Sequence, residues 1–206
     1  METNLLHDQN LTCRDNFVPL IPVGVSNRHV HLSQHDVEEL FGKNHVLRPF
    51  RSLNQHGQFA AHECVNVAGP KGFLTNVRVL GPCRDVSQLE VSRADCLSIG
   101  ISAPVRESGC LDNSASALLI GPAGHVMLNS QVICAWRHIH MSPKDAILLN
   151  VSDGQRVKVC SGGDRQLTFN EVIVRVHEDF QLELHIDTEE ANAAGLKNGS
   201  LVTLAY

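Results

Sequence analysis

RHVHLS at residues 28–33 is the stretch on which the fold of this chain depends, because it returns almost unchanged as RHIHMS at residues 137–142. A second pair of landmarks repeats as well. Candidate helix caps at Ser92 and Asp187 lie 95 residues apart, and so do Gly100 and Gly195, the glycines that would end the two helices. Landmarks repeated in this way indicate an internal duplication, so we expect two related halves.

The landmarks are spaced differently in the two copies. The two histidine motifs lie 109 residues apart, whereas the two helix caps lie 95 residues apart. The segment between motif and cap is therefore about 14 residues shorter in copy two. The extra segment is expected within residues 48–71, which contain the loop-like sequence NQHG at residues 54–57. In this alignment Glu90 of copy one corresponds to His185 of copy two.

Most of the remaining chain has the pattern of short strands. The candidate segments are rich in Val, Ile and Leu, and Gly, Pro, Asn or Asp separates many of them. This pattern favours small β-barrels or sandwiches over a doubly wound sheet. The few helices are short, with candidate N-caps at Ser33, Ser92, Ser142 and Asp187. The expected strands are 19–25, 64–68, 73–80, 87–91, 116–120, 126–135, 156–160, 166–176, 181–186 and 201–205.

Composition excludes several classes of function. Apolar residues make up 43% of the 206 residues, and the net charge is −5 with neutral histidines, which argues against a broad nucleic-acid surface. No apolar run of about 20 residues could cross a membrane, and the first residues lack the pattern of a secretory signal. Seven cysteines without a Cys-x-x-Cys spacing favour reduced thiols over a disulfide framework.

The repeated histidines have the spacing of metal ligands. Residues i and i+2 of a strand project from the same face, so His29 and His31 can share one ion, and His138 and His140 another. The duplication supplies a third ligand to each pair: Glu90 in copy one and His185 in copy two. His₂Glu and His₃ sets are both typical of catalytic zinc with an open fourth position.

Each candidate set also lies just before helix starts, whose free N–H groups favour anions. If the copies face one another, the site would suit a negatively charged substrate. A single His-x-His is more often a surface or hydrogen-bonded pair, and only the repetition favours ligands. Arg84, in the turn expected at residues 81–84, is the best candidate to hold a phosphate group. Six further histidines are expected to be structural or surface residues: His35, His45, His56, His62, His125 and His177.

Five stretches together resemble the phosphate propanoyltransferase family of phosphotransacylases, over residues 21–196. They are IPVGVSNRHVHLS from Ile21, GPKG from Gly69, NVRVLGPCRDVSQLEVSRAD from Asn76, RHIHMSPKDA from Arg137 and LELHIDTEEANAAG from Leu182.

The resemblance implies two β-barrel domains capped by short helices and related by the internal duplication. One would comprise residues 18–27 plus 136–206 through a strand exchange, and the other residues 28–135, with residues 1–17 as an N-terminal extension. It also implies two Zn²⁺ per subunit in the sets named above, although Co²⁺ or Fe²⁺ suits the same ligands. Phosphate would contact Arg84, and coenzyme A would contact Val25, Ser26, Asn27, Lys71, Arg78 and Asn192.

The implied activity is the interconversion of acyl-CoA (propanoyl-CoA, or acetyl-CoA) and phosphate with acyl phosphate and coenzyme A. By the same analogy the protein is a homodimer of the bacterial cytoplasm, without nucleic-acid or membrane partners. Some family members act in propanediol degradation inside bacterial microcompartments, next to shell and lumen enzymes, and often begin with an amphipathic encapsulation helix. Leu5, Leu6 and Leu11 give only a weak apolar stripe here.

Two other functions are compatible with the histidine motifs. A dinuclear metallohydrolase acting on acyl thioesters or esters would use water as the nucleophile and would not require phosphate. A non-catalytic, cupin-like metal- or nucleotide-binding module is the other, but a single barrel does not predict matched three-ligand sets in two copies.

Overall fold

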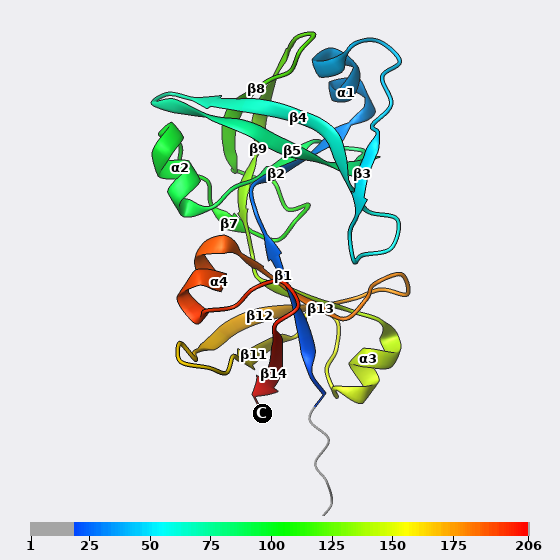
Figure 1. Ribbon diagram of the computed structural model, residues 1–206, viewed down its shortest axis with the longest axis vertical. Helices are drawn as coiled ribbons and strands as arrows, with labels where there is room; N and C mark the ends of the chain where they lie inside the picture. The colour runs from blue at the N-terminus through cyan, green and yellow to red at the C-terminus, as the bar shows by residue number, and fades with distance from the viewer. Residues whose placement is uncertain (1–18, 206) are drawn as a thin grey trace, which may run out of the picture.

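Two closed six-stranded β-barrels stack along the long axis of the molecule (Figure 1). The computed structural model describes residues 19–205, and the extension expected over residues 1–17 lies outside them. Barrel one, the upper barrel of Figure 1, has the order β4-β5-β2-β6-β9-β8 and closes by pairing of β8 with β4. Its strands are β2 (His29–Ser33), β4 (Phe59–Gly69), β5 (Gly72–Arg84), β6 (Gln88–Glu90), β8 (Ala115–Ile120) and β9 (His125–Ala135).

Barrel two, the lower barrel, has the closed order β1-β13-β10-β12-β11-β14. Its strands are β1 (Ile21–Ser26), β10 (His138–Met141), β11 (Arg156–Cys160), β12 (Thr168–Val176), β13 (Glu183–Asp187) and β14 (Leu201–Ala205). Short helices flank both barrels: α1 (Gln34–Phe41) and α2 (Arg93–Ile99) at barrel one, α3 (Pro143–Leu148) and α4 (Thr188–Ala194) at barrel two. The expected mainly-β, two-barrel fold is confirmed.

The two barrels have the same topology, as a duplication requires. In barrel one, β2 pairs in parallel with β5 and antiparallel with β6, and in barrel two β10 pairs in the same way with β12 and β13. Two short strands of barrel one were not expected from the sequence: β3 (Pro49–Ser52), which pairs with β4, and β7 (Val105–Arg106), which pairs with β9. β3 has no counterpart between α3 and β11, and it lies within residues 48–71, where the spacing of the landmarks puts the extra segment.

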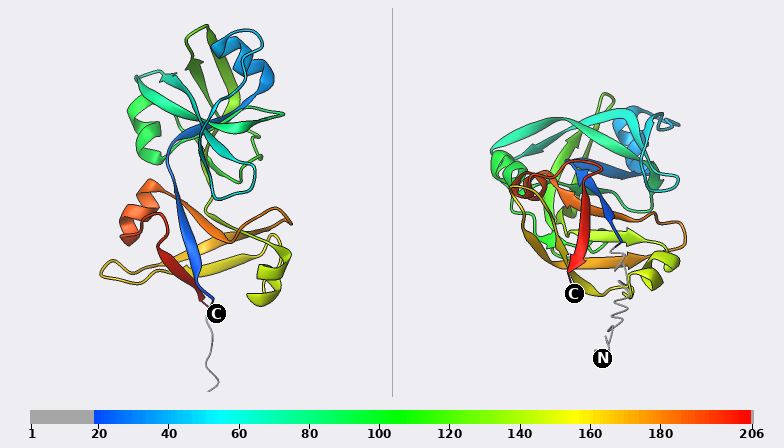
Figure 2. Two further views of the ribbon diagram at one scale, coloured as in Figure 1. Left: turned by 45° about the vertical axis from the view of Figure 1, so that its right-hand side comes forward. Right: turned by 60° about the horizontal axis from the view of Figure 1, so that its bottom comes forward.

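The strand that leads into each His-x-His strand belongs to the other barrel. β1 directly precedes β2, but it pairs with β13 and β14 in barrel two. β9 directly precedes β10, but it pairs with β6, β7 and β8 in barrel one. The chain therefore passes twice between the barrels, at residues 27–28 and 136–137, each time just before a His-x-His pair (Figure 2).

Alternation along the strands decides which side chains form the cores. Val30 and Leu32 of β2 are fully buried in barrel one, and Ile139 and Met141 of β10 are fully buried in barrel two. Successive strand residues point to opposite faces, so the histidines between them point away from the barrel cores. Apolar packing inside each barrel thus directs both His-x-His pairs outward.

All four expected helix caps are confirmed. Ser33, Ser92, Ser142 and Asp187 each accept a hydrogen bond from the backbone N–H three residues later. This bond satisfies one of the free N–H groups of the first helical turn. Among the described residues, no helix is long and apolar enough to span a membrane.

The tight turn expected at residues 81–84 is wrong. These residues continue β5, whose pairing with β2 shifts register between His31 and Ser33, so that Arg84 pairs with Ser33. A bulge in a continuous strand, which re-aims the side chains beyond it, replaces the turn. Arg84 is therefore held on the barrel wall beside the histidine strand.

Candidate metal centre and cleft

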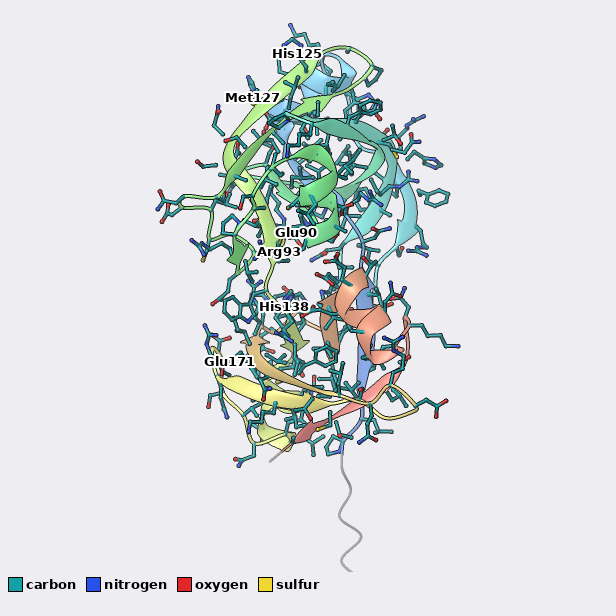
Figure 3. All side chains as sticks on the ribbon, turned by 90° about the vertical axis from the view of Figure 1, so that its left-hand side faces the viewer. Glu90, Arg93, His125, Met127, His138 and Glu171 are labelled. Atoms are coloured by element: carbon teal, nitrogen blue, oxygen red, sulfur yellow. The ribbon has the colours of Figure 1, made fainter. Side chains whose placement is uncertain are left out.

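A cleft of about 1050 Å³ lies between the outward faces of the two barrels, and all six candidate metal ligands line it. Figure 3 shows Glu90 of barrel one and His138 of barrel two on either side of the space between the barrels. The two residues also interact electrostatically, since His138 helps to lower the pKa of Glu90. The two sets come from different copies of the repeat, and they thus meet at one site.

The first set consists of His29 and His31 from β2 and Glu90 from β6, where Glu90 lies opposite His29 in the strand pairing. Their candidate ligand atoms lie within 4.8 Å of one another, and all three residues are buried. His29 Nδ1 lies 2.7 Å from the carbonyl oxygen of Asn27. A carbonyl can only accept, so Nδ1 carries the proton and Nε2 keeps the lone pair, 3.5 Å from the Glu90 carboxylate.

The second set repeats this geometry. His138 and His140 of β10 and His185 of β13 bring their candidate ligand atoms within 4.8 Å of one another. His138 Nδ1 donates to the carbonyl of Trp136 at 2.8 Å, as His29 does to Asn27. His140 Nδ1 is buried and has no hydrogen-bond partner among the described residues. An unsatisfied buried nitrogen is costly, and a metal ion would satisfy it, so the residues present fit the implied metal.

Burial keeps the imidazoles of His31, His138 and His140 in the neutral form that binds metals. It lowers the pKa of His138 to about 4 and of His140 to about 2, with further lowering by neighbouring histidines, and it lowers the pKa of His31 well below its usual value. For Glu90 burial acts in the opposite direction, but His29, His31 and His138 outweigh it and lower the pKa to about 2. At neutral pH these four donors are thus deprotonated, as metal ligands must be.

Two arginines face this centre. Arg84 donates from Nη2 to His31 Nε2 at 2.8 Å and from Nη1 to Ser108 Oγ at 3.3 Å. Arg175 of β12 lies opposite His140 in the strand pairing and lines the same cleft. Burial, together with the neighbouring Arg175, lowers the pKa of Arg84, although Glu90 opposes this effect. Two cationic groups beside two candidate metal sets make the cleft suited to anions.

Sequence reasoning missed Arg175. The duplication that nominated the metal ligands carries no signal for it, because Leu80 lies opposite His31 where Arg175 lies opposite His140. Only the strand pairing in barrel two puts this arginine beside the second set.

The residues expected to bind coenzyme A divide into two groups. Val25, Ser26, Asn27 and Arg78 line the cleft. Lys71 and Asn192 do not line it: Lys71 is exposed at the β4–β5 turn, and Asn192 is exposed on α4.

The other described histidines lie outside the centre. His125 is exposed at the far end of barrel one (Figure 3), and His35, His56, His62 and His177 are also exposed. His45 is partly buried and pairs with the Glu63 carboxylate at 3.0 Å. The six cysteines of the described part of the chain are free thiols.

Fold and site together define a two-barrel protein that brings two sets of candidate metal ligands and two arginines to one interdomain cleft. The family model for phosphate propanoyltransferase matches residues 22–197. The chain belongs to the phosphate propanoyltransferase family, and it is therefore an acyltransferase.

Curated relatives give the same result. A phosphate propanoyltransferase of Thermotoga maritima is 53% identical over 185 residues, which cover 89% of this chain and 88% of the relative. One from Salmonella typhimurium is 53% identical over 179 residues, or 86% and 85% of the two chains. One from Rhodobacter capsulatus is 48% identical over 194 residues, or 94% and 90%.

Proposed function

We propose that this protein transfers a propanoyl group, and the smaller acetyl group, between coenzyme A and inorganic phosphate at a dinuclear zinc site. A phosphate oxygen attacks the thioester carbonyl carbon, the carbon–sulfur bond breaks, and coenzyme A leaves as the thiolate. The observation that supports this assignment most strongly is that both ligand sets and both arginines line one cleft. The chain also belongs to a family named for phosphate propanoyl transfer.

The donor sets suggest the metal. Three nitrogen or carboxylate donors with room for a further ligand are typical of catalytic Zn²⁺, and Co²⁺ or Fe²⁺ could bind the same residues. Bound ions would supply Lewis-acid stabilisation of the thiolate, the phosphate and the thioester carbonyl. Glu90 gives the first set one negative charge, whereas the second set, with three neutral imidazoles, is uncharged. The second set therefore leaves more positive charge for phosphate.

Arg84 is the proposed catalytic residue, and it orients phosphate through charge-assisted hydrogen bonds. Arg175, on the opposite barrel, would contact the same anion from its other side. Val25, Ser26, Asn27 and Arg78 would hold coenzyme A in the cleft, with Lys71 and Asn192 contacting its outer part. The reaction needs no serine or cysteine nucleophile, so we propose direct attack by phosphate without an acyl-enzyme.

A coupled assay tests this function. Propanoyl-CoA should release coenzyme A only when phosphate is present, and propanoyl phosphate should form in equal amount. Release at the same rate without phosphate would instead identify a metallohydrolase that uses water. A covalent acyl-protein trapped during turnover would contradict direct attack.

The resemblance extends to organisation and location. We propose that residues 18–27 plus 136–206 and residues 28–135 act as two domains, and that two chains form a homodimer in the bacterial cytoplasm. Housing in a microcompartment, with shell or lumen enzymes of propanediol degradation as partners, belongs to the same proposal. Light scattering of the purified protein would test the dimer, and co-purification with shell proteins would test the microcompartment.

A further inference from the structure

Glu183 is a buried carboxylate that no step of the proposed reaction uses. It lies on β13, two residues before His185 and opposite His140 in the strand pairing, so its side chain shares the outward face of barrel two with the second metal set. Its Oε2 lies 2.7 Å from His185 Nε2. Because a carboxylate accepts, this bond fixes the proton on Nε2 and leaves the lone pair on Nδ1 of His185.

The first copy has a partner at the matching position. Gln88 lies two residues before Glu90, and its amide donates to Glu90 Oε1 at 2.6 Å. In copy one, the Gln88 amide donates to the candidate carboxylate ligand Glu90. In copy two, the Glu183 carboxylate accepts from the candidate imidazole ligand His185. This chemical matching indicates that the position serves to orient the third ligand of each set.

Barrel one holds Glu183 in place. Asn54 Nδ2 donates to Glu183 Oε1 at 2.5 Å, and Gln55 Nε2 donates to Oε2 at 3.3 Å. Gln55 is buried, and it also exchanges hydrogen bonds with the backbone of Gln181 at 3.1 and 3.2 Å. Both residues lie in the loop after β3, in the segment for which barrel two has no counterpart.

A glycine makes room for the carboxylate. Gly24 of β1 lies opposite His185 in the strand pairing. A Cβ on Gly24 would lie 2.7 Å from Glu183 Cδ and 2.9 Å from its Oε1, and the nearest atoms it meets all belong to this carboxylate. Gly24→Ala would therefore displace the Glu183 carboxylate.

We propose, on the basis of the proposed function in which His185 binds a metal ion, that Glu183 is a positioning residue for His185 and that Asn54 and Gln55 of the other barrel hold it there. The loop added to copy one thus sets the geometry of the metal site in copy two. Hydrogen-bond partners of ligating histidines typically change metal affinity by about 10–100-fold, so the clamp formed by Asn54, Gln55 and Glu183 should control the second ion selectively.

The test measures zinc affinity by competition with a chromophoric chelator, without relying on activity. In a His31→Ala background, which leaves the second set as the intact one, Glu183→Gln should weaken zinc binding about 10–100-fold. Gly24→Ala and the double variant Asn54→Ala/Gln55→Ala should weaken it in the same direction by at least about threefold. In a His140→Ala background, Glu183→Gln should change the affinity of the first set by less than about twofold.

Glu63→Gln is the matched control, because Glu63 is also a buried carboxylate paired with an imidazole, that of His45 at 3.0 Å, but it does not line the cleft. It should lower thermal stability and leave zinc affinity unchanged. Folded variants of Glu183, Gly24 and Asn54/Gln55 that all bind zinc as tightly as their parent would overturn the positioning role and leave the proposed function intact. A wild-type protein that binds no metal would overturn both.

Discussion

At the residue scale, the first histidine of each pair makes the same local hydrogen bond. His29 and His138 each donate a ring N–H to the carbonyl two residues earlier, at the points where the chain passes between the barrels. Such bonds fix the tautomer and ring orientation of a ligand before any ion binds. The second histidines differ: His31 Nε2 accepts from Arg84, whereas His140 Nδ1 has no partner among the described residues.

The loss of one imidazole should remove one ion. His140→Ala is expected to lower bound metal from two ions to one per chain and to reduce acyl transfer by at least about 100-fold, because the proposed second ion would act as a Lewis acid. Metal analysis and the coupled assay measure these effects. His125→Ala, at the far end of barrel one, is the control. A His140→Ala protein with two bound ions and full activity would refute the dinuclear centre.

Arg84 should act mainly on phosphate. Hydrogen bonds to charged groups contribute about 1.5–3 kcal/mol, so Arg84→Ala should raise the KM for phosphate about 10–100-fold and change the KM for acyl-CoA less than about twofold. Arg175→Ala should act in the same direction. Arg156→Ala, an exposed arginine paired with Glu171 on barrel two, is the control. An effect of Arg84→Ala on coenzyme A binding only would make its assignment wrong.

Glu63 should make stability depend on acid pH. Burial raises its pKa, but hydrogen bonds from Arg48 and His45 outweigh this and lower the pKa to about 2. A pKa below its unfolded value of about 4.3 means that the stabilisation is complete above that pH and is lost as pH falls toward 2. Urea unfolding should find Glu63→Gln about 1–3 kcal/mol less stable at pH 6. A difference that stayed constant down to pH 2 would contradict this cause.

At the element scale, each metal set depends on short strands that lead into capped helices. Glu90 ends β6 two residues before Ser92, and His185 lies two residues before Asp187. α2 begins with a reciprocal capping box between Ser92 and Asp95, whose carboxylate also pairs with Arg28 at 2.8 Å. Because α2 is only seven residues long, its stability depends on this cap and on packing rather than on helix propensity.

Ser92→Ala should therefore destabilise the protein by about 1 kcal/mol, the usual cost of losing an N-cap. Chemical unfolding measures this, and metal content should stay unchanged. Ser98→Ala, in the last turn of the same helix, is the control and should cost less, because alanine favours helix interiors. Equal effects of the two substitutions would show that the cap does not stabilise α2.

At the scale of the whole molecule, two crossings of the chain, after β1 and after β9, tie the barrels together. The strand before each His-x-His pair belongs to the opposite barrel, so the connecting residues cross the interface where the metal sets meet. Arg28–Asp95 and the backbone N–H groups of Arg93 and Ala94 bound to Glu189 add contacts near this crossing. Movement of one barrel relative to the other would therefore disturb these contacts and change the shape of the cleft.

Ile21 tests this arrangement, because it is fully buried in barrel two although it precedes barrel one in sequence. Ile21→Ala should cost about 2–5 kcal/mol. Hydrogen exchange should accelerate first in β13 and β14, the partners of β1. Val30 lies nine residues later in sequence but in barrel one, so Val30→Ala should instead accelerate hydrogen exchange first in β5 and β6. Loss of protection in β5 and β6 after Ile21→Ala would contradict the pairing of β1 with barrel two.

Several features of the site could be predicted from the sequence because they depend on short-range interactions. The i, i+2 spacing puts both histidines of a pair on one face, and the serine and aspartate caps mark where the helices start. The repeat then nominates Glu90 and His185, which a single copy would not distinguish from ordinary strand residues. The turn expected before Arg84 was wrong, because bulges depend on the pairing partner and leave little local signal.

The sequence by itself thus determined the mainly β character, the duplication and the two candidate metal sets, since alternation, capping and repetition are local properties of the chain. Only the tertiary structure decided that the sets share one cleft, that Arg175 joins Arg84 there, and that Asn54 and Gln55 reach Glu183. These contacts join residues up to 129 positions apart. These contacts depend on which strands pair and which barrel faces meet. Because many segments of similar composition could pair in other ways, the local sequence does not specify them.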